Sequence, residues 1–414
     1  MPTADPFSLN LRHLRALLIV RENGSISAGA RAASLSQSAL TQGIRKIENQ
    51  LSCELFERQA GGVAATPAGE LALRRIAAAL GHLDEAVRKL GPNHERSGRL
   101  LTLTHVRALI SLADARTFAS AASAARLSQT SVHRAVGDLE HLIDERLVDR
   151  RGQGSLLSFK GRQLARGFRL AGRELRAMIS ELSHDNRHMV PIAIGALAVA
   201  RPFIVPTAIA RMAGENPHAR FTVAEGDWQD LVEQLQDGVI DLIIGSLREL
   251  KPADLTQETL ADDQVLVLCG RHHPLAAAPD VSLADLARYP WIVASPLSPL
   301  RQLWEQMFAG QALPDGPVEC ESIMVAINLL AQSHFLTLAS PRQVELPLQA
   351  NRLAQVGSSI KTPNRPIGMI TRKNWRPTET EQRFIHLVAE AARHSGAAPI
   401  AQAQPRSQSR TTTG

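Results

Sequence analysis

The side chains best suited to chemistry in this sequence gather in one short segment near its N-terminus. Ser36 can cap a helix that starts at Gln37, and the apolar residues that follow recur at spacings of 4, 3 and 4: Leu40, Ile44, Ile47 and Leu51. The opposite face of that helix carries amide, hydroxyl and guanidinium groups, on Gln37, Ser38, Thr41, Gln42 and Arg45. Such groups can hydrogen-bond to base edges and phosphates, so this face predicts a recognition helix for the major groove of double-stranded DNA, with Ser36 at its start as a further DNA contact.

This segment occurs twice in the chain. Residues 9–58 and 101–150 align without a gap at a constant offset of 92, with 15 identical positions of 50. A period this long is not that of a solenoid, so we interpret the two segments, named copy 1 and copy 2, as a duplicated module. The polar face of copy 2 predicts further DNA contacts, by Gln129, Thr130, His133 and Arg134. Because that face also carries Asp138, whose charge would repel phosphate, we expect copy 2 to bind DNA more weakly.

Each copy has the elements that would hold such a helix in place. In copy 1 an apolar-periodic helix ends near Gly24, and a short Ala-rich helix that Ser27 can cap follows it. After the recognition helix, residues 53–66 with their two adjacent glycines predict a hairpin wing. Arg58 beside this wing, and Arg150 in copy 2, would contact a phosphate. The alternative interpretation is a three-helix core without a role in DNA binding.

Copy 1 resembles a known family. Its segment SLSQSALTQGIRKIENQLSCELFER, followed by TPAGE, is similar to the N-terminal domain of LysR-type transcriptional regulators. The resemblance implies that the helix after Pro67 is a linker helix, which pairs with its mate in a dimer. Copy 2 departs from the pattern, with Val148 in place of Phe56, although it retains Gly161. Family members normally have one such domain per chain, so copy 2 is either a second DNA-binding domain or a structural or dimerisation remnant.

Composition places the chain among globular proteins of several domains. It has 414 residues, of which 44% are hydrophobic and only 4% aromatic, so its cores are built from Leu, Ile, Val and Ala. It contains no run of 18 apolar residues, and its first residues lack the basic and apolar regions of a signal peptide. The three cysteines have no metal-like spacing. We therefore expect a cytoplasmic protein without a membrane partner.

Charge differs between the two halves of the chain. Residues 1–188 hold 27 Lys and Arg against 18 Asp and Glu, whereas residues 189–414 hold 19 against 22. A basic first half beside a mildly acidic second half is typical of a DNA-binding part joined to a ligand-binding part. A solvated basic surface would give the same balance.

The sequence predicts six regions in order along the chain. They are a winged helix-turn-helix (1–66), a linker helix and break (67–98), a second winged helix-turn-helix (99–158), a second linker helix and hinge (159–188), an effector-binding domain (189–395) and a disordered tail (396–414).

From Val190 the pattern changes to alternating strands and helices, which favours a parallel sheet with crossover helices. This part resembles the LysR effector domain, which is similar to periplasmic solute-binding proteins. By that resemblance, residues 264–276 cross to a second subdomain and residues 364–375 return to the first. The predicted fold is thus multidomain: two winged helix-turn-helix (mainly α) domains plus an α/β two-subdomain periplasmic-binding-protein-like sensor domain.

Ligands of such sheets bind beyond the carboxyl ends of the strands. Carried over by position, the loops there imply an effector site that contains Ala196, Leu197, Asp227, Ser246, Ser295, Leu297, Ser298, Ser322 and Ile323. Arg301 can pair with a carboxylate there. Asp227, in contrast, would disfavour an anion, which makes a neutral polyol or sugar-like effector conceivable.

The motifs of hydrolases, phosphate-binding loops and metalloproteases are missing, so we predict no enzyme, no metal and no cofactor. The sequence predicts a transcriptional regulator that binds specific double-stranded DNA as a homodimer or homotetramer and is modulated by a small-molecule effector. One alternative is a cytoplasmic solute-binding protein whose N-terminal repeats serve oligomerisation. A second is an enzyme such as a dehydratase with the same bilobal fold, for which an acid/base pair is missing.

Overall fold

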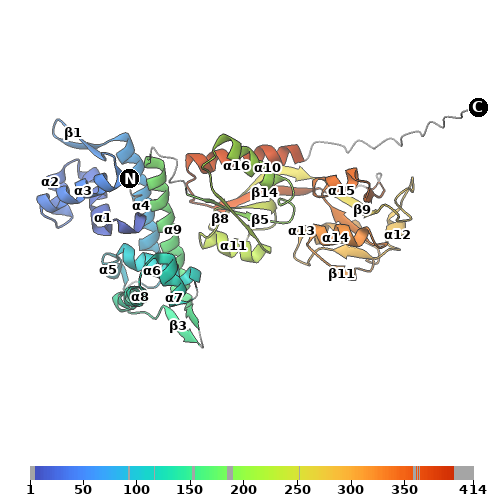
Figure 1. Ribbon diagram of the computed structural model, residues 1–414, viewed down its shortest axis with the longest axis horizontal. Helices are drawn as coiled ribbons and strands as arrows, with labels where there is room; N and C mark the ends of the chain where they lie inside the picture. Colours follow the sequence, from blue (N-terminus) through green and yellow to red (C-terminus); the bar gives the residue numbers. More distant parts are fainter. Residues whose placement is uncertain are drawn as a thin grey trace, which may run out of the picture. The chain divides into compact units, whose positions relative to one another are not determined.

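The computed structural model describes residues 5–91, 94–115, 117–151, 154–183, 190–250, 252–357, 360, 362 and 364–395. The chain divides into two compact units (Figure 1). The first unit contains both helix-turn-helix copies and two long helices, and the second contains both five-stranded sheets. The predicted tail and most of the predicted hinge lie outside the described residues.

Copy 1 forms three helices and a two-stranded wing. Its elements are η1 (Pro6–Ser8), α1 (Leu11–Asn23), α2 (Ile26–Ala32), α3 (Gln37–Leu51), β1 (Phe56–Gln59) and β2 (Gly62–Ala65). Helix α1 ends at Gly24, which has a φ of 60° and donates its N–H to Val20 O. Ser25, not Ser27, caps α2, because its side chain accepts the N–H of Ala28 while Ser27 already lies inside the helix.

Copy 2 repeats these elements with nearly the same lengths. They are α5 (Glu95–Gly98), α6 (Leu103–Ala115), α7 (Phe118–Ala125), α8 (Gln129–Ile143), β3 (Val148–Arg151) and β4 (Gly154–Leu157). Helices α1 and α6 both have 13 residues, and α3 and α8 both have 15. The two recognition helices also end alike, with Ser52 and Asp144 in the left-handed conformation. The duplication seen in the sequence is therefore a duplication of structure.

A long helix follows each wing, and the two helices pack against each other within one core. They are α4 (Pro67–Arg88) and α9 (Phe159–Leu182). The helices approach closely at Gly167, where an added Cβ would lie 2.4 Å from the Cβ of Ala86. The resemblance implied that the linker helix pairs with its mate in a second chain. In this structure its partner is the second linker helix of the same chain.

One ion cluster is buried at this helix pair. Arg75 of α4 donates to Glu174 Oε2 at 2.9 Å and to Glu181 Oε1 at 2.6 Å, both on α9. Burial by itself would lower the pKa of Arg75, but the hydrogen bonds and charges of the two glutamates raise that pKa above its ordinary value. The guanidinium therefore stays charged inside the interface.

The second unit begins with a mixed five-stranded sheet of order β6-β5-β7-β14-β8. Its strands are β5 (Ile192–Ala196), β6 (Phe221–Glu225), β7 (Leu242–Ser246), β8 (Leu255–Asp263) and β14 (Arg365–Arg372), and its helices are α10 (Ile204–Glu215), α11 (Trp228–Gln236) and α16 (Glu379–Ser395). Strands β5 and β7 are parallel, but β14 is antiparallel to β7 and β8. The predicted parallel pairing is therefore confirmed for β5 and β7, but it is wrong for β14, which returns from the second subdomain and runs in the opposite direction.

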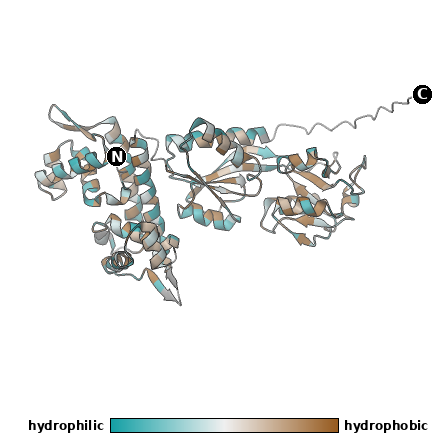
Figure 2. Cartoon of the chain, viewed as in Figure 1, coloured by the Kyte–Doolittle hydropathy of each residue, from teal (hydrophilic) through white to brown (hydrophobic). Residues whose placement is uncertain are grey.

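The second subdomain has a sheet of order β11-β10-β12-β9-β13. Its strands are β9 (Leu266–Gly270), β10 (Trp291–Val293), β11 (Val318–Glu319), β12 (Leu336–Ala339) and β13 (Leu353–Gln355); its helices are α12 (Leu283–Leu286), α13 (Pro299–Met307), α14 (Ile323–Leu330), η4 (Pro341–Gln343) and α15 (Glu345–Gln349). Figure 2 shows apolar residues along the central strands, and every residue of β5, β7, β9, β10 and β12 is buried. This burial explains the continuous apolar runs of the sequence.

Gly69 of α4, the equivalent of Gly161 in copy 2, offers a test of how the linker helix packs against the start of the wing. An added Cβ on Gly69 of α4 would lie 2.0 Å from Leu55 O, whereas on Gly81 of the same helix it would meet nothing within 4 Å. We expect Gly69→Ala to lower the free energy of unfolding of the first unit by about 1–3 kcal/mol. Gly81→Ala, the control, should leave it unchanged or raise it by about 0.5–1 kcal/mol. Chemical denaturation followed by circular dichroism measures both, and equal midpoints would contradict the predicted contact.

Candidate DNA-binding and effector sites

Helix α3 presents the predicted polar face of copy 1 to solvent. Ser36 caps the helix, because its Oγ accepts the N–H of Ala39 at 3.2 Å, and Leu40, Ile44, Ile47 and Leu51 are buried below. Gln37, Ser38, Gln42 and Arg45 are exposed, and Thr41 is half-buried. Thr41 donates its hydroxyl to Gln37 O at 2.8 Å. The exposed side chains are therefore held on a rigid helix, where they can reach a groove without rearrangement.

A glutamate in each recognition helix holds the start of the wing. Glu48 Oε1 accepts the N–H groups of Leu55 and Phe56 at 2.9 and 3.4 Å. In copy 2, Glu140 Oε1 accepts those of Leu147 and Val148 at 2.7 and 3.1 Å. This shared bond explains why the two copies keep a glutamate at this position. It fixes β1, in which Arg58 is exposed, relative to the recognition helix.

The polar face of copy 2 is exposed but differs in character. Gln129, Thr130 and Arg134 are exposed, as is Asp138. The ring of His133 stacks on Phe118 with centroids 3.6 Å apart, so its position is set by α7. The side chain of Arg150 lies outside the described residues. DNA contact by each of these residues stays a prediction.

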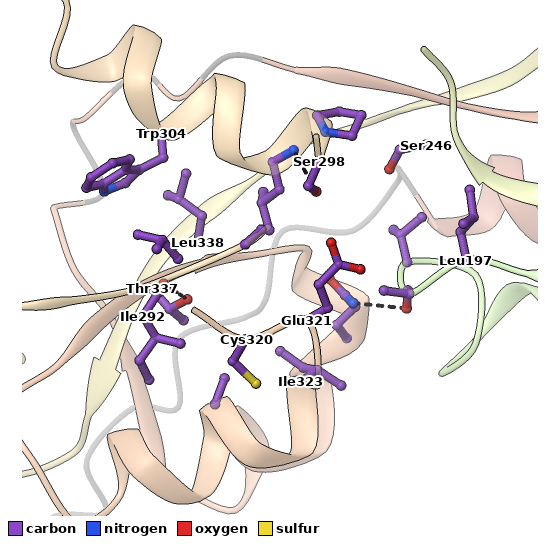
Figure 3. A pocket seen from close by; sticks show the side chains of 18 of the residues that line it. Leu197, Ser246, Ile292, Ser298, Trp304, Cys320, Glu321, Ile323, Thr337 and Leu338 are labelled. Atoms are coloured by element: carbon purple, nitrogen blue, oxygen red, sulfur yellow. Dashed lines mark hydrogen bonds between the residues drawn. The ribbon is translucent and has the colours of Figure 1, made fainter. Parts of the chain in front are cut away.

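In the second unit a pocket lies at the carboxyl ends of strands from both subdomains (Figure 3). Its apolar lining includes Leu197, Val199, Ile292, Trp304, Ile323 and Leu338. Its polar lining consists of Ser246, Arg248, Ser298, Glu321, Ser322, Thr337, Gln343 and Arg365. Such a pocket, with apolar side chains beside polar and charged ones, is suited to a small organic molecule that has both an apolar body and a polar group.

The structure brings five of the nine residues predicted for the effector site into this lining: Leu197, Ser246, Ser298, Ser322 and Ile323. The other four lie outside it. Ala196 is the last residue of β5, and Leu297 is exposed. Asp227 accepts the N–H of Asp230 at the start of α11, and Ser295 donates to Glu321. Arg301, expected to meet a carboxylate, pairs with Glu305 of its own helix instead.

Several polar groups of the pocket were not anticipated from the sequence. Arg365, at the start of β14, donates Nε to Asp263 Oδ2 at 2.7 Å, and Ser340 donates to the other oxygen of Asp263 at 2.6 Å. Among the described residues, no hydrogen-bond partner faces the buried Arg365 Nη2. The apolar strand that follows Arg365 offered the only signal, since an arginine before a buried strand must find a counter-charge.

Arg248 is the second such group. Its Nη1 donates to Leu297 O at 3.0 Å, and its guanidinium lies 4.7 Å from the ring centroid of Trp228. Within the described part of the chain its buried Nε has no hydrogen-bond partner. Burial lowers the pKa of Arg248, while the charges of Glu321 and Asp227 act in the opposite direction.

Hydrogen bonds from two residues of the pocket lining, Arg248 and Gln343, also join the subdomains. Besides the bond from Arg248 to Leu297, Gln343 Nε2 donates to Ala198 O at 3.2 Å. Each bond links a side chain of one subdomain to a backbone carbonyl of the other. A ligand that changed either bond would change the angle between the subdomains.

The cysteines are free thiols. Burial, with a smaller contribution from Glu48, raises the pKa of Cys53, and burial raises that of Cys269 to about 12. Neither thiol is therefore activated as a nucleophile. Among the described residues, no cluster of three His, Cys, Asp or Glu could hold a metal, and none of the helices is long and apolar enough to cross a membrane.

Comparison with known proteins identifies the family. The model of the bacterial regulatory helix-turn-helix of the lysR family matches twice, at residues 11–70 and 103–162. The LysR substrate binding domain matches residues 188–393. The chain belongs to the LysR family of transcriptional regulators: it binds DNA, and a small-molecule effector modulates it. Its structure confirms the predicted fold, with two helix-turn-helix domains and a two-subdomain α/β sensor.

The chain is similar to two known regulators in sequence and to one solved structure in fold. The HTH-type transcriptional regulator GalR of Pseudomonas putida is 29% identical over 88% of this chain and 92% of that protein. The SDS degradation transcriptional activation protein of a Pseudomonas species is 30% identical over 65% of this chain and 90% of that protein. A full-length OxyR of Pseudomonas aeruginosa shares the fold, with a TM-score of 0.59 and 19% identity over 74% of this chain and 99% of that one.

The two recognition faces should differ in their contribution to affinity. None of the residues proposed to bind DNA on the face of Arg45 is acidic, whereas Arg134 shares its face with the exposed Asp138. We expect Arg45→Ala to weaken operator binding about tenfold or more, and Arg134→Ala to weaken it less. Binding titrations at several salt concentrations measure both losses. A larger loss for Arg134→Ala would reverse the predicted ranking.

Proposed function

We propose that copy 1 recognises bases of the operator through Gln37, Ser38, Thr41, Gln42 and Arg45, while Arg58 of the wing contacts phosphate. The observation that carries this proposal is the exposed polar face of α3, on a helix capped by Ser36 and fixed to the wing by Glu48. Copy 2 contributes Gln129, Thr130, His133, Arg134 and Arg150 to the same task. The protein works in the cytoplasm, where bacterial DNA lies, and catalyses no reaction.

The effector is a small organic anion with an apolar body. The unpaired N–H groups of Arg248 and Arg365 support a carboxylate, because a buried donor without an acceptor is costly. The first turns of α13 and α14 also begin in the lining, at Ser298 and Ser322, and helix N-termini favour negative charge. The polyol hypothesis rested on Asp227, and it loses its basis because Asp227 lies outside the pocket lining.

Effector binding changes how the sensor domains assemble. The bonds of Arg248 to Leu297 and of Gln343 to Ala198 hold the two subdomains together, and a carboxylate on Arg248 would compete with the first of them. A changed angle between subdomains alters the surface through which sensor domains pair into a homodimer or homotetramer. Through this pairing the effector changes the arrangement of the DNA-binding domains on the operator.

The first experiment is genome-wide chromatin occupancy of the intact protein, followed by footprinting on the most enriched site. We expect a protected DNA site near a neighbouring gene. The length or pattern of its footprint should change when the effector is present. Absence of any enriched site, with or without candidate ligands, would favour the solute-binding alternative and make copy 1 an assembly module.

The effector class has its own test. We expect isothermal titration with aromatic and aliphatic carboxylates to detect binding, and uncharged sugars to give none. Arg248→Met should weaken carboxylate binding about tenfold or more, because a charge-assisted hydrogen bond is lost. Arg271→Met changes an exposed arginine outside the pocket lining and is the control. Unchanged affinity in the Arg248 variant, or tight binding of a sugar, would contradict the proposal.

A further inference from the structure

The two helix-turn-helix copies form a pseudosymmetric pair within one chain. Arg75 contacts Glu174 across the linker helices, and at the offset of 92 their equivalents are Gly167 and His82. These equivalents also meet: a Cβ on Gly167 would lie 3.0 Å from His82 O. A contact between positions i and j that is repeated between j and i is the mark of a two-fold axis. The axis here relates two parts of a single chain.

The segments that precede the two copies also make reciprocal contacts. Phe7 of η1, before copy 1, lies against copy 2: an added Cβ on Gly172 of α9 would be 3.4 Å from its ring, and the guanidinium of Arg107 is 5.8 Å from its centroid. In return, Gly98 of α5, before copy 2, lies beside Val87 of α4 and accepts a hydrogen bond from Arg15 of α1. Each copy thus covers its neighbour reciprocally.

The charges at the linker helices favour this mixed pair over a pair of identical helices. In the same register, two α4 helices would place the buried Arg75 opposite His82 and Lys89, the equivalents of Glu174 and Glu181. Two α9 helices would leave both glutamates opposite Gly167 without a cation. A buried charge without a partner is strongly unfavourable. Only α4 with α9 gives Arg75 two carboxylates.

The recognition faces of this pair are unlike. At equivalent positions, Gln42 corresponds to Arg134, Arg45 to Gly137 and Lys46 to Asp138. Two identical recognition helices related by a two-fold axis bind a palindrome, since each meets the same bases. Two helices that differ in charge and hydrogen-bonding groups at these positions require different bases in the two halves.

We infer that one chain carries a complete pair of DNA-recognition domains and that its operator consists of two unlike half-sites, one for each copy. The inference rests on the proposed DNA-binding function and adds the form of the partner DNA. A single chain binds both half-sites, so two chains on DNA would occupy four of them.

The test starts from the operator selected by the intact protein from random DNA. Its halves, A for copy 1 and B for copy 2, are recombined into A–B, A–A and B–B duplexes. We expect A–B to bind about tenfold or more tightly than either symmetric duplex. Gln42→Ala should weaken the base preference in half A alone, and Arg134→Ala that in half B alone. These exposed, equivalent positions serve as controls for each other.

Equal binding of A–A and A–B, with no effect of Arg134→Ala on half B, would overturn the inference and make copy 2 a structural remnant. Failure to select any DNA would instead refute the proposed DNA-binding function, so the two failures are distinguishable.

A second measurement tests whether the pair forms within one chain. Protein labelled with ¹⁴N and protein labelled with ¹⁵N are mixed, allowed to exchange, and cross-linked between acidic and amino groups. We expect peptides of α4 joined to peptides of α9 to carry one isotope only. Mixed-isotope peptide pairs in statistical proportion would show that the helices pair between chains and would overturn the inference.

Discussion

The arrangement of the first unit depends on the burial of one guanidinium between two carboxylates. Arg75 is 7% exposed, and its ion pairs with Glu174 and Glu181 of α9 compensate the loss of its hydration. Removal of one partner from such a cluster costs about 3–5 kcal/mol, which is a large part of the stability of a typical domain. The cluster therefore fixes the register of α4 on α9, and with it the positions of both recognition helices. The close approach at Gly167 then requires the small side chain of Ala86 opposite it.

Much of the first unit could be predicted from the sequence because its determinants are local. Apolar spacing within α3 and α8, the caps at Ser36 and Ser128, and the turns after them all act over a few residues. The position of Ser25 as the cap of α2 could not be chosen over Ser27 by spacing alone. The pairing of α4 with α9 could not be predicted at all, since Arg75 and Glu174 are 99 residues apart and a charged residue in an amphipathic helix is usually solvated.

In the effector pocket, too, some residues could be predicted from the sequence and others could not. Residues at or just after the ends of strands, such as Leu197, Ser246 and Ser322, line the pocket because of the sheet topology, so their place could be inferred from the alternation of strands and helices. Arg365 reaches it from the other direction, at the start of an antiparallel strand that enters the first sheet late in the chain. Its position depends on Asp263, which is 102 residues away from Arg365 in the sequence. Asp263 in turn accepts a hydrogen bond from Ser340, 77 residues further along the chain. Only tertiary structure brings these three groups together.

The two copies agree in residues that determine their backbone structure and differ in residues that face DNA or each other. Positions that determine the backbone structure are the same or similar in both copies. They are the glutamate that binds the start of each wing (Glu48 or Glu140), the glycine that lies against the carbonyl before the wing (Gly69 or Gly161), and the hydroxyl residue that caps each linker helix (Thr66 or Ser158). Several positions on the recognition face, such as Gln42 and its equivalent Arg134, differ, and so do those at the helix pair, such as Arg75 and its equivalent Gly167. In a symmetric pair, one substitution changes both halves of an interface at once, so Arg75 of one α4 helix would meet His82 and Lys89 of an identical helix. Duplication within one chain removes that constraint, because Arg75 on α4 and Glu174 on α9 can be selected separately. The same freedom allows each recognition helix to adapt to its own bases.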